Sequence, residues 1–372
     1  MNIFEIMYDK FTFNKKTITL FEAFAGIGSQ AIALKQLSKE FDFELDTIGI
    51  SEIDKYAIAA YNEIHGETKN YGSICDIQEI PQVDIFTYSF PCQDISLAGN
   101  RKGFSRDSNT RSGLLWEVER LLENQEKIDK LPQVLLMENV KALVGLKFKD
   151  DYIEWQLKLE ELGYKNYWQV LNAKHYGIPQ NRERVFMVSI LGEYHYTFPD
   201  NFPLKLRLKD MLENNVDEKY YLSDKAIAKT QRNRMGGNYI DKTEPTIGTI
   251  IAGYYKIPGD GIYLKETNKI IYEEPLLRKG WHNKACEVLN TEGITTCIHT
   301  QSNNLLQKVK EPNNLRIRKL TPKECYRLMG FSDDEFAKAE SVISNSQLYK
   351  TAGNSIVVDV LYYIFKNLFI GG

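Results

Sequence analysis

The sequence predicts an α/β fold: a doubly wound, mostly parallel sheet with a smaller irregular domain attached. Apolar, β-rich runs at residues 17–24, 47–50, 83–88 and 134–137 alternate with segments of helical spacing at 29–37, 57–64 and 114–122. Two more runs, at 168–171 and 184–190, have the pattern of a strand pair around a turn. Such alternation is typical of a parallel sheet that helices cover on both faces.

The regular alternation ends near residue 192. Residues 194–260 contain scattered Gly, Asn, Pro and Tyr, and residues 261–310 have the pattern of short strands and loops. Helical signals return at 321–328, where Thr321 is a candidate N-cap before Pro322, and at 357–368. We therefore expect a large domain over 1–190, a smaller one over 191–330, and a C-terminal segment, 331–372, that returns to the large domain.

The 372-residue chain is 43% hydrophobic and 26% charged, as expected of a soluble globular protein. No apolar run reaches the roughly 18–20 residues of a membrane span, and the start lacks the basic-then-apolar order of a signal peptide. The five cysteines are widely spaced, which disfavours a disulfide framework and favours a reducing cytosol. The net charge is −3, but residues 191–320 carry 20 Lys and Arg against 16 Asp and Glu. This local basicity suits phosphate contact, although chance unevenness explains it equally well.

A glycine-rich turn follows the first expected strand. Residues 24–28, Phe-Ala-Gly-Ile-Gly, lie where glycines let a ligand approach the backbone and where a helix N-terminus offers free N–H donors. Glu52 ends the next strand, a position at which carboxylates bind ribose hydroxyls in nucleotide-binding sheets. Together they indicate a nucleotide-like ligand, with a ligand-free turn and a solvated strand end as the alternatives.

Two later strands end in side chains that can react. Cys92 follows the third strand within Ser-Phe-Pro-Cys-Gln, and ligands of open parallel sheets bind beyond the carboxyl ends of the strands. Glu138 ends the fourth strand, where burial would raise the pKa of its carboxyl and favour a role in proton transfer. Arg182 and Arg184 precede the run 184–190, with Arg184 nearer to its apolar residues. Taken singly, these residues also fit a buried thiol, a helix cap and surface charges.

In this order the motifs resemble those of the C5-cytosine-specific DNA methyltransferases. The matching segments are residues 24–28, Pro-Cys-Gln at 91–93, Glu-Asn-Val at 138–140, Gln-x-Arg-x-Arg at 180–184, Arg-Lys-Leu-Thr-Pro-Lys-Glu at 318–324 and Gly-Asn-Ser at 353–355. The resemblance covers about residues 17–190 and 314–368. It implies an enzyme with the fold of S-adenosylmethionine-dependent methyltransferases, in which residues 1–190 hold the cofactor and the catalytic groups and residues 191–330 recognise the target.

The resemblance also implies a reaction path. Cys92 would add to C6 of a cytosine flipped out of duplex DNA, so that C5 becomes nucleophilic and takes the methyl group. Glu138 would hold or deliver a proton at N3 and bind the exocyclic amine, and Arg184 would bind O2. Arg182, grouped with these catalytic residues, would support the site, and Asn139 would order the loop that carries Cys92. No metal is expected.

The cofactor implied by the resemblance is S-adenosyl-L-methionine, which leaves as S-adenosyl-L-homocysteine. Glu52 would hold its ribose and Ile53 would pack on its adenine. Asp76 would bind the adenine amine, although the sequence around it matches the family pattern only over a short stretch. The other residues expected to form the pocket are Phe24, Gly26, Gly28, Ile77, Pro91, Leu114 and Asn354.

Contacts with DNA are expected from two regions. Residues 96–112 suit a mobile segment over the pocket, with Gly99, Gly103 and Gly113 as hinges. Residues 191–313 occupy the position of the family's target-recognition region. They contain no clear match to the short Thr-Leu element of that region, and residues 296–298 are the candidate for a divergent counterpart. The cations expected to contact DNA, each of which alone also fits a surface charge, are Arg101, Lys102, Arg106, Arg111, Arg232, Arg234, Lys256, Arg278 and Lys279.

We expect a monomer that acts on double-stranded DNA in the cytoplasm of a bacterial or phage-infected cell, with any cognate restriction endonuclease acting separately. Three alternatives stay open. One is the same chemistry on transfer RNA, whose enzymes usually have a shorter recognition region than 191–313. Another is a catalytically inactive DNA-binding regulator, against which the intact Cys92, Glu138 and Arg184 argue. A third is a nicotinamide oxidoreductase, whose Gly-x-Gly-x-x-Gly pattern is broken by Ala31.

Overall fold

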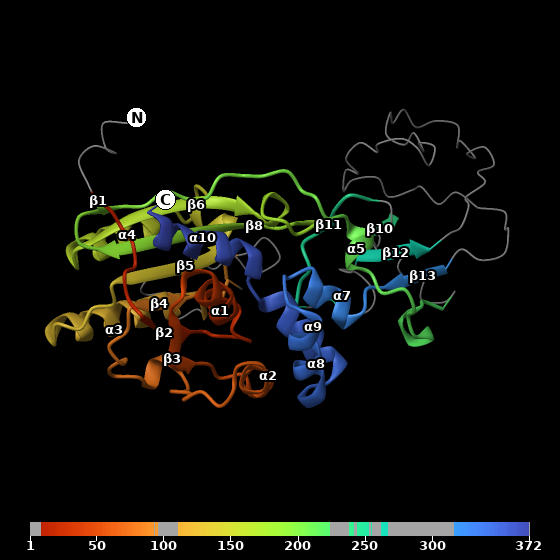
Figure 1. The fold of residues 1–372 in the computed structure, drawn as a ribbon, viewed down its shortest axis with the longest axis horizontal. Helices are drawn as coiled ribbons and strands as arrows, with labels where there is room; N and C mark the ends of the chain where they lie inside the picture. Colours follow the sequence, from red (N-terminus) through yellow and green to blue (C-terminus); the bar gives the residue numbers. More distant parts are fainter. Residues whose placement is uncertain are drawn as a thin grey trace.

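The computed structural model describes residues 9–92, 94–95, 111–223, 238–241, 244–252, 254, 262–266 and 316–371. Within them, a six-stranded sheet dominates the larger part of the molecule (Figure 1). Its order is β3 (Glu44–Ser51), β2 (Thr17–Ala23), β4 (Ile85–Tyr88), β5 (Val134–Val140), β8 (Glu183–Leu191) and β6 (Tyr164–Asn172).

The first four strands in this order are parallel to one another, whereas β8 runs antiparallel to both β5 and β6. The predicted α/β fold with a mostly parallel sheet is therefore confirmed, as is the strand pair at 168–171 and 184–190. Each expected strand begins or ends within a few residues of an observed one, because long apolar runs bounded by polar residues are the most reliable local signal.

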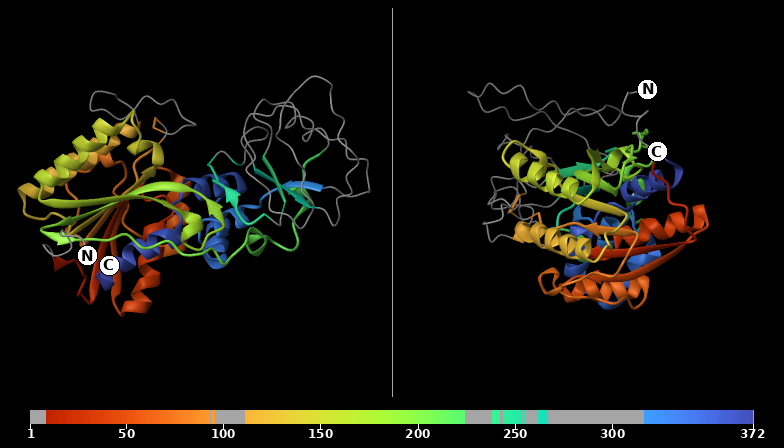
Figure 2. Two further views of the ribbon diagram at one scale, coloured as in Figure 1. Left: turned by 90° about the horizontal axis from the view of Figure 1, so that it is seen from above. Right: turned by 90° about the vertical axis from the view of Figure 1, so that its left-hand side faces the viewer.

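Helices cover both faces of the sheet (Figure 2). On one face, α1 (Ser29–Phe41), α2 (Lys55–His65) and α10 (Val358–Ile370) contribute to one apolar cluster. On the other, α3 (Leu115–Lys127) and α4 (Lys149–Glu161) form a second cluster. In β5, Leu136 faces the first cluster and Leu135 and Met137 face the second, so that both sides of the strand are buried and it appears in the sequence as a continuous apolar run.

A smaller part of the molecule contains a three-stranded sheet of β10 (Asn238–Asp241), β12 (Ile262–Glu266) and β13 (Arg316–Lys319). Two-stranded pairs join distant segments: β11 (Ile247–Gly248) pairs with β7 (Gln180–Asn181), and β1 (Asp9–Lys10) with β9 (Tyr194–His195). Short helical turns are η2 (Ile74–Asp76), η3 (Arg111–Leu114), η4 (Lys141–Val144), η5 (Ala173–His175), α5 (Leu208–Met211) and η6 (Glu218–Tyr220).

The chain returns through α7 (Pro322–Arg327), α8 (Asp333–Val342) and α9 (Asn345–Asn354) to α10, which packs against α1. Thr321 is the N-cap of α7, as predicted: its hydroxyl accepts the Glu324 N–H at 3.1 Å. The sequence did not predict α4, α8 or α9, because their polar residues interrupt the apolar spacing. Within the described residues, no helix is long and apolar enough to cross a membrane.

Candidate active site

The groups predicted to react come together at one edge of the large sheet. Strands β2, β3, β4 and β5 are parallel, so residues 24–28, Glu52, Cys92 and Glu138 all follow or end carboxyl ends of strands at the same edge. Strand β8 runs the opposite way, so its first residues reach this edge too, which brings Arg184 to Glu138. The strand directions thus assemble a site from segments that are up to 160 residues apart in the chain.

Glu138 and Arg184 form an ion pair across two strands. Arg184 Nε lies 3.1 Å from Glu138 Oε1, and the side chain of Glu138 is 11% exposed and that of Arg184 18%. In the register of β5 and β8, Glu138 is opposite Phe186 and Arg184 is opposite Val140, a diagonal arrangement that places both side chains on one face. The pair is joined through a single guanidinium nitrogen, which leaves hydrogen-bonding positions of both groups for a ligand.

Cys92 is a free, half-buried thiol within the electrostatic reach of this pair. Burial raises the pKa of the Cys92 thiol above its usual value, and the Glu138 carboxylate raises it further, whereas Arg184 and Arg182 act in the opposite direction. Burial likewise raises the pKa of Glu138, against the two arginines. The structure therefore brings the four residues predicted as catalytic into one interacting group, in which thiol and carboxyl both keep their protons to higher pH than in water.

Two side chains hold the backbone around Cys92. Asn139 Nδ2 donates to the Phe90 carbonyl at 3.0 Å, which is the loop contact expected of it. The buried Ser112 hydroxyl donates to the Pro91 carbonyl at 2.6 Å. Sequence reasoning treated Ser112 only as the end of a loop, and no local pattern distinguishes a buried serine from a solvated one. Both contacts fix the approach to the thiol through backbone carbonyls.

Arg182 differs from Arg184 in where its donors go. Its guanidinium is buried and donates to the carbonyls of Ile250 (2.9 Å), Gly353 (3.2 Å) and Ser355 (2.9 Å). It thus ties the start of β8 to the segment at 250 and to the end of α9. Gly353 is required there, because a Cβ at this position would lie 2.2 Å from the Ala252 nitrogen. This geometry fits the supporting role expected of Arg182, and its grouping with the catalytic residues stays a prediction.

The expected cofactor side of this edge has an open surface. Glu52 Oε2 accepts the Gly26 N–H at 2.9 Å, and its Oε1 accepts the N–H groups of Ile53 and Asp54, both at 2.8 Å. Ile53 is 75% exposed, an unusual position for an isoleucine. A Cβ at Gly26 would meet no atom within 4 Å. A carboxylate, an apolar wall and free space next to a glycine turn suit a nucleoside ligand.

The other predicted cofactor residues lie as follows. Phe24 is half-buried and has a positive φ of 56°, which is rare for a residue with a side chain. Gly26 and Gly28 also have positive φ values, of 57° and 79°, which glycine adopts easily. Asp76 and Asn354 are exposed, and Pro91 and Leu114 are half-buried. Ile77 is only 5% exposed and packs into the cluster under α3 and α4, which leaves it little surface for a ligand.

The ion pair between Lys350 and Asp54, at 2.5 Å, was not expected from the sequence. It joins α9, which carries Asn354, to the N-cap of α2 next to Ile53. Two charges almost 300 residues apart give no local signal of their contact. The pair brings the C-terminal segment against the edge where the cofactor is expected.

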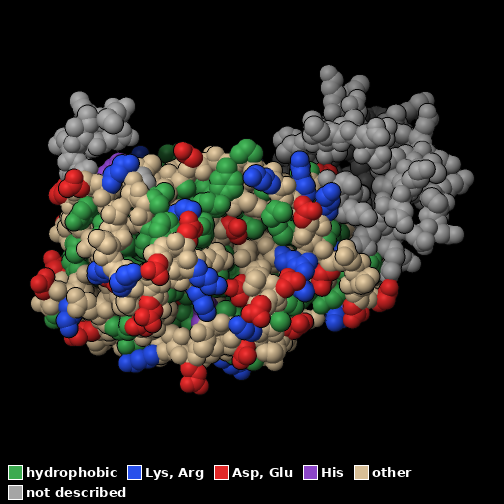
Figure 3. Space-filling model, in the orientation of Figure 1, with side chains coloured by type: hydrophobic (Ala, Val, Ile, Leu, Met, Phe, Trp, Pro, Cys, Tyr) green, Lys and Arg blue, Asp and Glu red, His purple; other side chains and the backbone are tan. Residues whose placement is uncertain are grey.

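The residues expected to contact DNA lie outside the described part of the chain, as do hinges Gly99 and Gly103 and residues 296–298; only the backbone of Arg111 is described, at the start of η3. On the face of the molecule that Figure 3 shows, Lys and Arg side chains alternate with Asp and Glu over the described surface. The described surface on that face therefore shows no large patch of only positive or only negative side chains.

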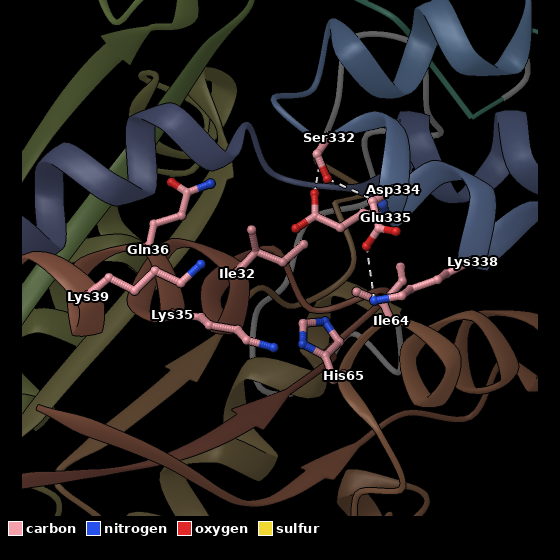
Figure 4. Close-up of a pocket in the computed structure, with 10 residues that line it drawn as sticks. All are labelled: Ile32, Lys35, Gln36, Lys39, Ile64, His65, Ser332, Asp334, Glu335 and Lys338. Atoms are coloured by element: carbon pink, nitrogen blue, oxygen red, sulfur yellow. Dashed lines mark hydrogen bonds and ion pairs between the residues drawn. The ribbon is translucent and has the colours of Figure 1, made fainter.

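A cavity of about 250 Å³ lies elsewhere, between α1, α2 and α8 (Figure 4). Lys35, His65, Glu335 and Lys338 are among its lining residues, whereas Cys92, Glu138 and Glu52 are not. One of its lining residues, His65, also contacts the glycine turn, with Nε2 at 3.1 Å from the Ile27 carbonyl.

Comparison with known proteins agrees with this arrangement. The profile of the family described as C-5 cytosine-specific DNA methylase matches residues 18–370. The Type II methyltransferase M2.ScrFI of Lactococcus lactis subsp. cremoris is 35% identical, over 95% of this chain and 99% of that protein. The Orphan methyltransferase M.SssI of Spiroplasma monobiae is 30% identical, over 96% of this chain and 98% of that protein.

Among solved structures, the Entamoeba histolytica methyltransferase EhMeth has a TM-score of 0.71 at 19% identity, over 95% of this chain and 99% of that chain. The S. pombe Dnmt2 methyltransferase has a TM-score of 0.66 at 18% identity, over 94% and 98%. At such identities these likenesses bear on the fold alone. From the family match over most of its length, the chain belongs to the C-5 cytosine-specific DNA methylases and is an enzyme of that family.

Proposed function

We propose that this enzyme transfers a methyl group from S-adenosylmethionine to C5 of cytosine in double-stranded DNA, through a covalent bond between Cys92 Sγ and C6 of a flipped-out base. The observation that carries the proposal is the Glu138–Arg184 ion pair beside the Cys92 thiol, at the sheet edge that also holds Glu52 and the glycine turn.

The residues at this edge fit each step. The Cys92 thiol gives up its proton to solvent as Sγ adds to C6, and the electron pair of the C5–C6 double bond moves into the ring, toward N3 and O2. Glu138, whose carboxyl keeps its proton to higher pH than usual, places a proton at N3, and Arg184 stabilises charge at O2. Once C5 carries the methyl group, a base takes the C5 proton, and the electrons of that C–H bond re-form the C5–C6 double bond and expel Cys92. Glu138 takes back the N3 proton, which restores the neutral ring.

The cofactor, when bound, supplies an electrophilic methyl group on a sulfonium. Glu52 would hold the ribose: each of its oxygens has more than one acceptor position, so the backbone contacts with Gly26, Ile53 and Asp54 leave room for ribose hydroxyls. Ile53 offers an apolar surface for the adenine. Phe24, Asp76, Pro91, Leu114 and Asn354 would complete the pocket, with Ile77 contributing through packing. No metal takes part.

Duplex DNA is the substrate that the family description and the long segment 191–313 favour over transfer RNA. In this proposal residues 1–190 carry catalysis, residues 191–330 recognise the target, and residues 331–372 return to the large domain. The names of the relatives, a type II methyltransferase and an orphan methyltransferase, fit either a restriction–modification system or a solitary modifying enzyme. A monomer would suffice, because one chain holds all the proposed groups.

The deciding experiment measures methyl uptake from labelled S-adenosylmethionine into duplex DNA and into transfer RNA, with bisulfite sequencing of the product DNA. Cys92→Ala should abolish uptake, retain cofactor binding and form no covalent adduct with 5-fluorocytosine DNA. Cys75→Ala, which removes an exposed free thiol, is the matched control and should behave like the wild type. Normal uptake by Cys92→Ala would refute the nucleophile, and uptake into transfer RNA alone would refute the substrate.

A further inference from the structure

Behind the glycine turn lies a buried polar pair that the proposed chemistry does not use. Glu22 of β2 and Tyr61 of α2 are both fully buried. The Tyr61 hydroxyl donates to Glu22 Oε2 at 2.5 Å, and the Ala31 N–H, in the first turn of α1, donates to Glu22 Oε1 at 3.3 Å. The carboxyl group thus connects α2 with the start of the helix that the turn opens.

Helix α2 also contacts the turn directly. A Cβ at Gly28 would lie 2.2 Å from His65 Nε2 and 2.7 Å from Tyr61 Cε2, so the two rings close the space behind this glycine. His65 Nε2 lies 3.1 Å from the Ile27 carbonyl, and its ring lies 4.3 Å from that of Tyr61. The space in front of Gly26 is open. The turn therefore has a protein wall on one side and room for a ligand on the other.

We propose that Tyr61 is a positioning residue for the cofactor, which acts through Glu22 to hold residues 24–28 and the first turn of α1 in the conformation that binds S-adenosylmethionine. This inference rests on the proposed function. Tyr61 and Glu22 touch the turn from behind, so they act on the cofactor only through the backbone.

The charge of Glu22 makes the effect measurable. Burial raises the pKa of Glu22 to about 7, and the hydrogen bonds from Tyr61 and Ala31 lower it from a still higher value. The ionised carboxylate accepts both bonds and lies at the positive end of the α1 dipole. The titratable group next to the pair is His65, with Lys35 of α1 and Lys338 of α8 beside it; burial lowers the pKa of His65 to about 4, so it stays neutral above pH 5.

Calorimetric titration of the full chain with S-adenosylmethionine alone, between pH 6 and 9, tests this. Wild-type affinity should rise with pH around a midpoint near 7. In Tyr61→Phe a lost hydrogen bond to the charged form should move the midpoint up by about one unit, so affinity falls about threefold at pH 7.5 and recovers by pH 9. Glu22→Gln should lack this step and keep only the titration of the cofactor's own amino group.

Tyr196→Phe is the matched control: it loses a buried hydroxyl, bonded to the Ile364 carbonyl at 2.9 Å, on the α10 side of the sheet, and should keep the wild-type pH curve. At saturating cofactor, Tyr61→Phe should retain its kcat and show its defect in KM. An unshifted midpoint, or a loss that high pH does not restore, would overturn the inference. If Glu22→Gln does not fold, the pH curve of Tyr61→Phe alone decides the inference. If the wild-type protein does not bind S-adenosylmethionine at all, that result refutes the proposed function instead.

Discussion

Two Arg–Glu pairs in the described part of the chain each lie next to a cysteine, and they differ in how far the protein itself satisfies the carboxylate. Arg318 and Glu324 are both 0% exposed and form a bidentate pair at 2.8 and 2.9 Å. Glu324 also accepts the N–H groups of Thr321 and Glu213. Cys325, beside it, is sealed in the core. In this closed pair the carboxylate is fully engaged by groups of the protein itself.

The Glu138–Arg184 pair is open by comparison. Its single contact is longer, at 3.1 Å, both side chains keep some exposure, and the neighbouring Cys92 is only half-buried. Burial raises the pKa of both cysteines, so that property does not distinguish the two places. What differs is unused bonding capacity next to an accessible thiol, and this is the physical mark of a site that a substrate completes.

The same substitution in each pair gives the sharpest contrast, and the largest effect is expected in the open one. Glu138→Gln removes the proposed proton donor at N3 and should lower the single-turnover rate of methyl transfer by about two to four orders of magnitude. The free energy of unfolding should hardly change, because the cost of burying the carboxylate, which raises its pKa, offsets its attraction to Arg184. Rapid quench and urea unfolding measure the two quantities, and a near-wild-type rate would remove Glu138 from this role.

Glu324→Gln should have the reverse signature. It leaves the Arg318 charge buried without its partner, which should cost about 3–5 kcal/mol of unfolding free energy. Turnover by the folded fraction at low temperature should remain close to that of the wild type. If Glu324→Gln instead lost its rate while keeping its stability, the distinction between closed and open pairs would be wrong.

Substitution of the arginines separates two side chains that are only two residues apart. Arg184→Lys keeps the charge but loses the planar guanidinium, so the rate should fall about 10- to 100-fold with little change in stability. Arg182→Lys cannot reach the carbonyls of Ile250, Gly353 and Ser355 together, so the melting temperature should fall instead. Steady-state kinetics with thermal melts tests both, and equal rate losses in the two variants would contradict the assignment.

The smallest effect concerns thiol reactivity. Because the Glu138 charge raises the pKa of Cys92, Glu138→Gln should lower that pKa, so alkylation of Cys92 should begin at lower pH. Peptide mapping after iodoacetamide treatment follows each cysteine separately. Cys325 should stay unlabelled in the folded protein at every pH tested, and its labelling at the rate of Cys92 would show that the core around the closed pair is open.

Much of this could be predicted from local pattern. The strands at 17–24, 83–88 and 134–137 are long apolar runs, so hydrophobic periodicity alone located them, and the residue after each strand was a candidate for the site because parallel strands end at one edge. The N-cap at Thr321 followed from the spacing of Thr, Pro and Glu. Helices α8 and α9 were missed because tertiary packing, and no clear apolar period, stabilises them.

The sequence by itself determined the main strands of the large sheet, the helices α1, α2, α3, α7 and α10, and the family to which the chain belongs, and it supplied the candidates for the reactive groups. Only the tertiary structure decided which arginine pairs with Glu138 and which donates to backbone carbonyls, that Ser112 contacts Pro91 and Lys350 contacts Asp54, and that Tyr61 lies behind the glycine turn. Some of these are contacts between residues 21 to 296 positions apart. The others depend on where each of two nearby arginine side chains, Arg182 and Arg184, points at the start of β8. Spacing along the chain carries no record of them, because they arise only when the sheet brings distant segments to one edge.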